Sequence, residues 1–122
     1  MTEITRQHLE DAALAAGHRV VHTLAEFLGE EEDAATCGTV LLHGVQRAWR
    51  PHLGDGDAAR LAVRIMMMID CDEAGYCHAI HGQIETISVS HDCTRLDKMR
   101  AWREAVVLCA AEVGRQMREG VR

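Results

Sequence analysis

The longest periodic segment lies at the C-terminal end of the chain and predicts one long amphipathic helix. Thr94 stands where an N-cap residue is expected, Asp97 follows at the capping-box position, and Gly120 marks the end. Between them, apolar side chains recur at the steps of three and four that define one helix face. These are Met99, Trp102, Val106, Cys109, Ala110, Val113 and Met117. We expect this face to be covered by a second layer of structure.

Residues 65–90 predict that second layer, a three-stranded antiparallel meander. The expected strands are 65–69, 76–81 and 84–90. Gly82 and Gln83 alone join the last two, and a two-residue connection with glycine first is typical of a type II′ hairpin. In that register His78 faces Ile87 and Cys77 faces Ser88. The face expected to cover the core carries Tyr76, His78, Ile80, Ile87 and Val89.

The N-terminal half predicts shorter elements. A first helix begins after Thr5 as N-cap and ends at Gly17. Residues 18–28 fit either a helical continuation or a strand, whereas 39–43 fit a strand. Residues 49–53 are expected to be extended around Pro51. In the turn 54–57, Asp55 or Asp57 is expected to be the N-cap of the next helix. That helix is expected to bury Leu61, Ala62 and Ile65.

Length and composition complete the expected fold class. The chain has 122 residues, 48% of them hydrophobic, which is enough for one domain with one core. We therefore expect residues 1–122 to form a single α+β domain. Its antiparallel sheet, the meander plus N-terminal strands, is packed by two to three helices.

Charge and targeting signals exclude several classes of function. The formal net charge is −6, which disfavours binding to phosphate backbones. The N-terminal residues lack the apolar core of a signal peptide, and no apolar run is long enough to span a bilayer. Five cysteines at scattered positions do not resemble a disulfide scaffold. We expect a cytoplasmic protein with reduced cysteines that uses neither a membrane nor nucleic acid.

Metal binding is the sharpest alternative, because cysteines and histidines concentrate in and after the meander. The candidate ligands are Cys77, His81, His91 and Cys93. They lack paired Cys-x-x-Cys knuckles. On one strand face the Cα atoms of Cys77 and His81 would stand about 13 Å apart. We therefore expect no metal and no other cofactor, and keep zinc as the alternative.

Catalytic residues do not converge in the sequence. There is no Gly-x-Ser-x-Gly elbow, and Cys77 and His78, although adjacent, point to opposite faces of a strand. Cys109 lies on the buried stripe of the last helix, where cysteine is ordinary apolar filling. We expect the chain not to be an enzyme.

Acidic residues are the candidates for contact with a partner. They form the run Glu30, Glu31, Glu32 and Asp33 and the pair Asp72 and Glu73 at the predicted meander turn. A solvated surface is the simpler interpretation of such a run. The alternative is an acidic patch that meets a basic partner.

Two stretches carry a resemblance to a known group of proteins. Residues 49–63, WRPHLGDGDAARLAV, resemble a Trp-x-Pro…Asp-Gly-Asp-Ala-x-Arg-Leu-Ala-Val signature, and residues 101–117 resemble the helix that accompanies it. Both are similar to small bacteriophage and prophage proteins of the phage α/β/α-sandwich type. The resemblance covers about a third of the chain and brings no catalytic residues with it.

The resemblance implies a phage or prophage accessory protein that binds a host protein complex. Inhibition of a host defence, as by an anti-CRISPR protein, is one function of this kind. Acidic side chains would then meet the basic nucleic-acid groove of that complex. The alternatives left open are a small zinc-binding or nucleic-acid-associated protein that uses the Cys/His-rich meander, and a homodimer.

Overall fold

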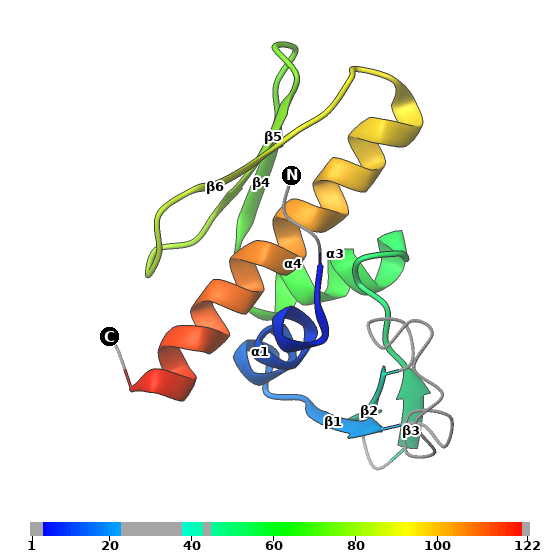
Figure 1. Ribbon diagram of the computed structural model, residues 1–122, viewed down its shortest axis with the longest axis vertical. Helices are drawn as coiled ribbons and strands as arrows, with labels where there is room; N and C mark the ends of the chain where they lie inside the picture. Colours follow the sequence, from blue (N-terminus) through cyan, green and yellow to red (C-terminus); the bar gives the residue numbers. More distant parts are fainter. Residues whose placement is uncertain (1–3, 23–37, 43–44, 121–122) are drawn as a thin grey trace.

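The chain folds into an α+β domain in which helices lie between two antiparallel sheets (Figure 1). The computed structural model describes residues 4–22, 38–42 and 45–120. The described helices are α1 (Arg6–Ala16), α3 (Asp55–Arg64) and α4 (Arg95–Glu119). The strands are β1 (Arg19–His22), β2 (Gly38–Leu42), β3 (Val45–Ala48), β4 (Met68–Cys71), β5 (Tyr76–Ile80) and β6 (Ile87–Ser90). The α+β prediction is confirmed, but the meander and the N-terminal strands, expected in one sheet, form two separate sheets.

The ends of α1 and α4 follow from local sequence signals. The Thr5 hydroxyl accepts from the backbone N–H of His8 at 3.2 Å, and the His8 ring accepts from the N–H of Thr5 at 3.0 Å. Thr94 caps α4 by accepting from the N–H of Asp97. Gly17 and Gly120 close the two helices in the left-handed conformation, with φ of 75° and 71°. These four boundary predictions are confirmed.

Helix α1 lies directly against α4, and small side chains make this approach possible. A Cβ atom on Gly114 of α4 would stand 1.7 Å from the carbonyl oxygen of Asp11 in α1. The buried residues of α1 are mainly alanines, and those of α4 are Ala101, Ala105, Val106, Val107, Cys109, Ala110, Ala111, Val113 and Gly114. The predicted stripe was wrong at its end, because Met117 is 51% exposed.

Helix α3 begins differently from the prediction. Its N-cap is Gly54, so neither acid caps it. The Asp57 carboxylate instead accepts from the N–H of Arg50 at 2.9 Å. Residues 51–53 form a turn where an extended segment was expected. That turn is held by Pro51 and Trp49, both buried.

In the first half of the chain, β1, β2 and β3 form an antiparallel sheet in that order. Over residues 19–22 the structure has the strand alternative that the sequence left open. The strand expected at 39–43 is present as β2. The rest of the ambiguous segment, from residue 23 to 28, lies outside the described residues.

In the second half, β4, β5 and β6 form the expected meander, but its register differs from the predicted one by a single residue. His78 pairs with Ser88 and Cys77 pairs with Val89, where Ile87 and Ser88 were expected. The connection between β5 and β6 is longer than the predicted two residues, because β5 ends at Ile80 and β6 begins at Ile87. A shift of one residue exchanges the faces of one strand relative to the next.

The register determines which face of the meander meets α4. The inner face carries Ile69, Cys71, Cys77, Ala79, Ile87 and Val89. Cys77 and Ala79 are fully buried, whereas Tyr76 and Ile80 are 45% and 40% exposed. The prediction that Tyr76, His78 and Ile80 cover the core was therefore wrong, although Ile87 and Val89 do face inward.

Cys71 and Cys77 form a disulfide across the β4–β5 hairpin. They are directly opposed in the ladder with Cα atoms 4.1 Å apart, as in a pair without mutual backbone hydrogen bonds. The expectation that all the cysteines are reduced was wrong for these two. Of the remaining described cysteines, Cys93 is exposed and Cys109 is buried.

Candidate functional site

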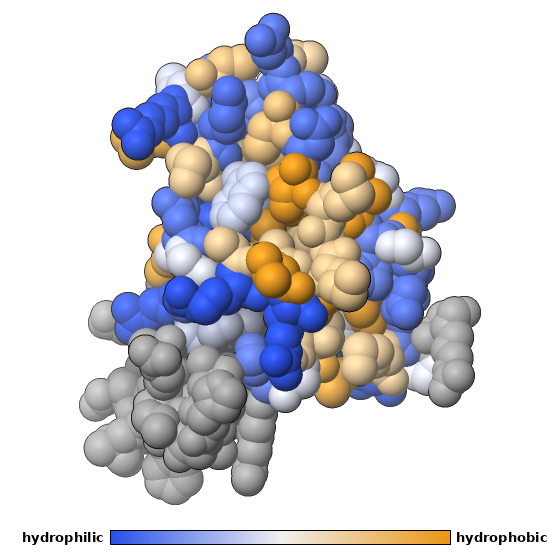
Figure 2. Space-filling model, turned by 180° about the vertical axis from the view of Figure 1, so that it is seen from behind, coloured by the Kyte–Doolittle hydropathy of each residue, from blue (hydrophilic) through white to orange (hydrophobic). Residues whose placement is uncertain are grey.

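The face of the meander turned away from α4 is half apolar and is the first candidate contact surface. By the ladder register this outer face carries Met68, Asp70, Tyr76, His78, Ile80, Ser88 and Ser90. Met68 and Ile80 are direct cross-strand partners, and Met68 is 69% exposed. Figure 2 shows the rear of the molecule, where apolar side chains gather in and below the middle and hydrophilic ones lie mainly above them and at the sides.

A chain of hydrogen bonds crosses this outer face. The Asp72 carboxylate lies 2.8 Å from Nε2 of His78, and Nδ1 of His78 lies 2.8 Å from the hydroxyl of Ser88. The ring of Tyr76 stacks on that of His78 at 6.1 Å. The hydrogen bond from His78 is the main cause that holds the pKa of Asp72 below its ordinary value, and the N–H of Tyr76 contributes. The sequence prediction missed the link from His78 to Ser88 because the predicted register placed Ser88 opposite Cys77.

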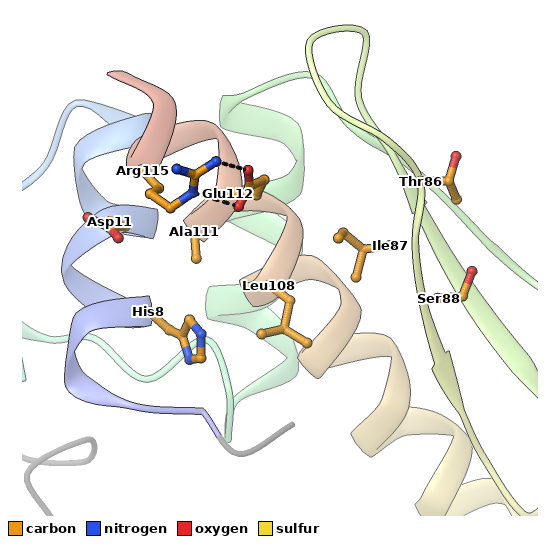
Figure 3. A pocket seen from close by; sticks show the side chains of 9 residues that line it. All are labelled: His8, Asp11, Thr86, Ile87, Ser88, Leu108, Ala111, Glu112 and Arg115. Carbon is orange, nitrogen blue, oxygen red and sulfur yellow. Dashed lines mark hydrogen bonds and ion pairs between the residues drawn. The ribbon is translucent and has the colours of Figure 1, made fainter. Parts of the chain in front are cut away.

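The order Ser–His–Asp resembles that of a nucleophile, a base and an orienting acid. Acyl transfer also needs a substrate hollow and oxyanion donors on the side of the serine hydroxyl. The hollow that Ser88 borders lies between β6 and α4, and the side chain of Ser88 points away from it (Figure 3). We therefore interpret the hydrogen bonds among Asp72, His78 and Ser88 as structural contacts that hold the ends of β4, β5 and β6 together.

The predicted acidic contact residues fall in two places. Asp72 and Glu73 occupy the β4–β5 turn at one end of the outer face, and Asp70 adds an exposed acid on the face itself. The Asp72 carboxylate is occupied by His78 and by the N–H of Tyr76, whereas Glu73 is exposed. Glu30, Glu31, Glu32 and Asp33 lie outside the described residues.

The four candidate metal ligands are not brought together. Cys77 is in the disulfide, and Nε2 of His81 lies 3.1 Å from the carbonyl oxygen of Ile65. His91 is buried and accepts from the N–H of Cys93, whose thiol faces the carbonyl of Glu73. Within the described ranges, no group of three or more His, Cys, Asp or Glu residues is arranged to hold a metal ion.

A groove between β6 and α4 is the second candidate contact surface (Figure 3). One hollow of about 380 Å³ is bounded by α1, α4 and β6, and a second of about 570 Å³ continues it along the β5–β6 loop. Ile87 and Glu112 line both hollows, so the two adjoin. Volumes of this order suit a bound segment of small size.

Searches of known protein families, of curated proteins and of solved structures found no match to this chain. Among the described residues, no helix has both the length and the apolar character to cross a bilayer. The geometry of the two contact surfaces is therefore the basis for a functional proposal.

Proposed function

We propose that this chain works by binding another protein through the outer face of the β4–β5–β6 sheet. The observation that supports the proposal is the exposure of Met68, Tyr76 and Ile80 on one sheet face, although the sheet has a well-covered inner face. Met68 and Ile80 adjoin as cross-strand partners, and Tyr76 lies further along the same face, beyond the Asp70–His78 pair. Exposed apolar side chains among polar ones are typical of protein–protein contact sites.

The charges on and around this face favour a basic partner. Asp70, Asp72 and Glu73 are acidic, and the outer face as defined carries no lysine or arginine. A second copy of the chain would bring the same acids together, and like charges across an interface are unfavourable. The occupant that fits is a protein with an apolar centre and a basic rim.

The resemblance to phage and prophage proteins supports the finer part of the proposal. A host defence complex that binds nucleic acid presents a basic groove, and an acidic protein can occupy it by electrostatic complementarity. We propose inhibition of such a complex, in the manner of an anti-CRISPR protein, as the biological role.

Substitutions on the outer face provide the test. The immobilised chain is incubated with lysate of a bacterial host, and captured proteins are identified for wild type, Met68→Asp and Leu96→Asp. Leu96 is 84% exposed on α4, away from the outer face, and serves as the matched control. We expect one basic protein or complex to be captured by wild type and Leu96→Asp and lost with Met68→Asp. Capture that rises with salt, or that Met68→Asp leaves intact, would contradict the proposal.

A further inference from the structure

Beyond the outer face, we propose that the free edge of β6 binds an extended segment of a partner protein as an added strand. The segment would lie in the groove between β6 and α4 and would carry a basic side chain. The proposal concerns a different surface from the outer sheet face and does not depend on it.

The first step is the hydrogen-bonding pattern of the edge. The N–H of His91 donates to the carbonyl of Gly75 at 2.8 Å, so the pair 75–91 is hydrogen-bonded. In an antiparallel ladder, hydrogen-bonded pairs alternate with pairs that are not hydrogen-bonded. The pairs 76–90 and 78–88 are therefore not hydrogen-bonded, and the backbone groups of Ser88 and Ser90 point away from β5. Because β6 is the last strand of the sheet, they point to the open edge.

The second step is the state of that edge. Arg100 on α4 donates to the carbonyl of Ser90 at 3.3 Å and so occupies one end. For the N–H and carbonyl of Ser88, the described part of the chain offers no hydrogen-bond partner. Edge strands are usually blunted by charges, lysine or proline, yet β6 reads Ile-Ser-Val-Ser. The edge therefore keeps its capacity to pair with another strand.

The third step is the apolar floor of the groove beside that edge. Ile87 turns toward Leu108 and Ala111 of α4, and these three form an apolar floor (Figure 3). Strand addition combines backbone hydrogen bonds with pockets for alternate side chains, and this floor supplies such a pocket. Ser88 contributes its backbone to the groove, because its hydroxyl is turned to His78 on the other side.

The charges of the groove select the occupant. Arg115 is held between Glu112 and Glu119, a set with one net negative charge. Glu85 adds a further exposed acid at the other end of the groove. An extended segment with a small apolar side chain over the floor and a lysine or arginine near Glu85 fits this arrangement.

The test uses peptides as the probe and the full chain as the target. A displayed library of random heptapeptides is selected on the purified protein, and the best synthetic peptide is titrated against wild type and two variants. Ser88→Pro removes the outward N–H, a position at which edge strands tolerate proline. Ser88→Ala keeps the N–H and removes only the hydroxyl. We expect Ser88→Pro to weaken binding at least tenfold and Ser88→Ala to change it less than twofold.

A second measurement does not depend on the folding of the variants. The same peptide is synthesised with every second amide N-methylated, in both frames, and one frame is expected to lose binding at least tenfold. Glu85→Gln should weaken binding of the basic peptide about threefold. The proposal is overturned if no peptide is enriched, or if binding tolerates both N-methylated frames. Since Met68→Asp should leave peptide binding unchanged, failure here is distinct from failure of the outer-face proposal.

Discussion

Replacing Gly114 by alanine tests whether the close contact between α1 and α4 governs the stability of the domain. The added Cβ atom would stand 1.7 Å from the carbonyl oxygen of Asp11 and 2.4 Å from its carbonyl carbon. Both atoms belong to the backbone of α1, so no side-chain rotation can relieve the clash. Ordinary contact distances of about 3.5 Å require the two helices to separate by nearly 2 Å.

The expected magnitude follows from two opposing terms. Overpacking of a well-filled core costs about 1–3 kcal/mol, and a clash with backbone belongs at the upper end. Alanine is better than glycine inside a helix by about 1 kcal/mol, which offsets part of that loss. We expect a net loss near 2 kcal/mol in the free energy of unfolding, or about 8 °C in Tm for a domain of this size.

Gly56→Ala is the matched control, because it makes the same substitution inside another helix, α3. The nearest atoms to its Cβ would be those of the Arg60 guanidinium, at 3.3 Å, and that side chain is 73% exposed and can shift together with its surface ion pair to Asp57. Stability should stay unchanged or rise by up to about 1 kcal/mol. Urea unfolding followed by circular dichroism measures both variants. If Gly114→Ala proves as stable as Gly56→Ala, the inferred helix contact is wrong.

Three further outcomes are expected. Arg118→Met should lower the free energy of unfolding by about 1–2 kcal/mol in urea titrations, because it leaves the buried carboxylate of Asp11 without its guanidinium partner. The pKa of Asp97 is held below its ordinary value of 3.8 mainly by a hydrogen bond from the guanidinium of Arg100. The ionised Asp97 therefore stabilises the fold above that ordinary pKa, and this stabilisation is lost as the pH falls through the lower pKa of the folded state. Asp97→Asn should therefore flatten the acid limb of a stability profile below about pH 4. Burial raises the pKa of Cys109 to about 11, so peptide mapping after alkylation at pH 8 should find the exposed Cys93 modified and Cys109 intact until the domain unfolds.

The predictions that succeeded depend on neighbouring residues in the chain. Thr5 and Thr94 each cap a helix through a backbone N–H three residues ahead, and Gly17 and Gly120 adopt positive φ where a helix must end. These signals are local, so no tertiary information is needed to find them. The predicted N-cap of α3 was wrong because it depends on a more distant residue. The carboxylate of Asp57 accepts a hydrogen bond from the backbone N–H of Arg50, seven residues earlier.

The register of the meander failed because it depends on a choice between two faces of similar apolarity. A tight turn at Gly82 and Gln83 would pair Cys77 with Ser88, and the longer loop pairs it with Val89. Both arrangements are antiparallel hairpins that the sequence allows. The hydrogen bond between His78 and Ser88 depends on the observed arrangement, so the predicted register hid it. The disulfide lies across the other strand pair, β4–β5, and was missed because the expected strand 65–69 ended before Cys71.

The choice of face follows from how closely α4 approaches the sheet. The Sγ atom of Cys77 lies 3.7 Å from the carbonyl oxygen of Lys98, so the sheet meets the backbone of the helix. On β5 such an approach favours small side chains, which places Cys77 and Ala79 inside and leaves the larger Tyr76 and Ile80 outside. The larger inward side chains, Ile69, Ile87 and Val89, lie on the flanking strands β4 and β6. Counting apolar residues on each face predicts the reverse, because that count ignores the room available. The same close packing that stabilises the domain thus leaves Tyr76 and Ile80 of β5 on the open face, the face that we propose another protein covers.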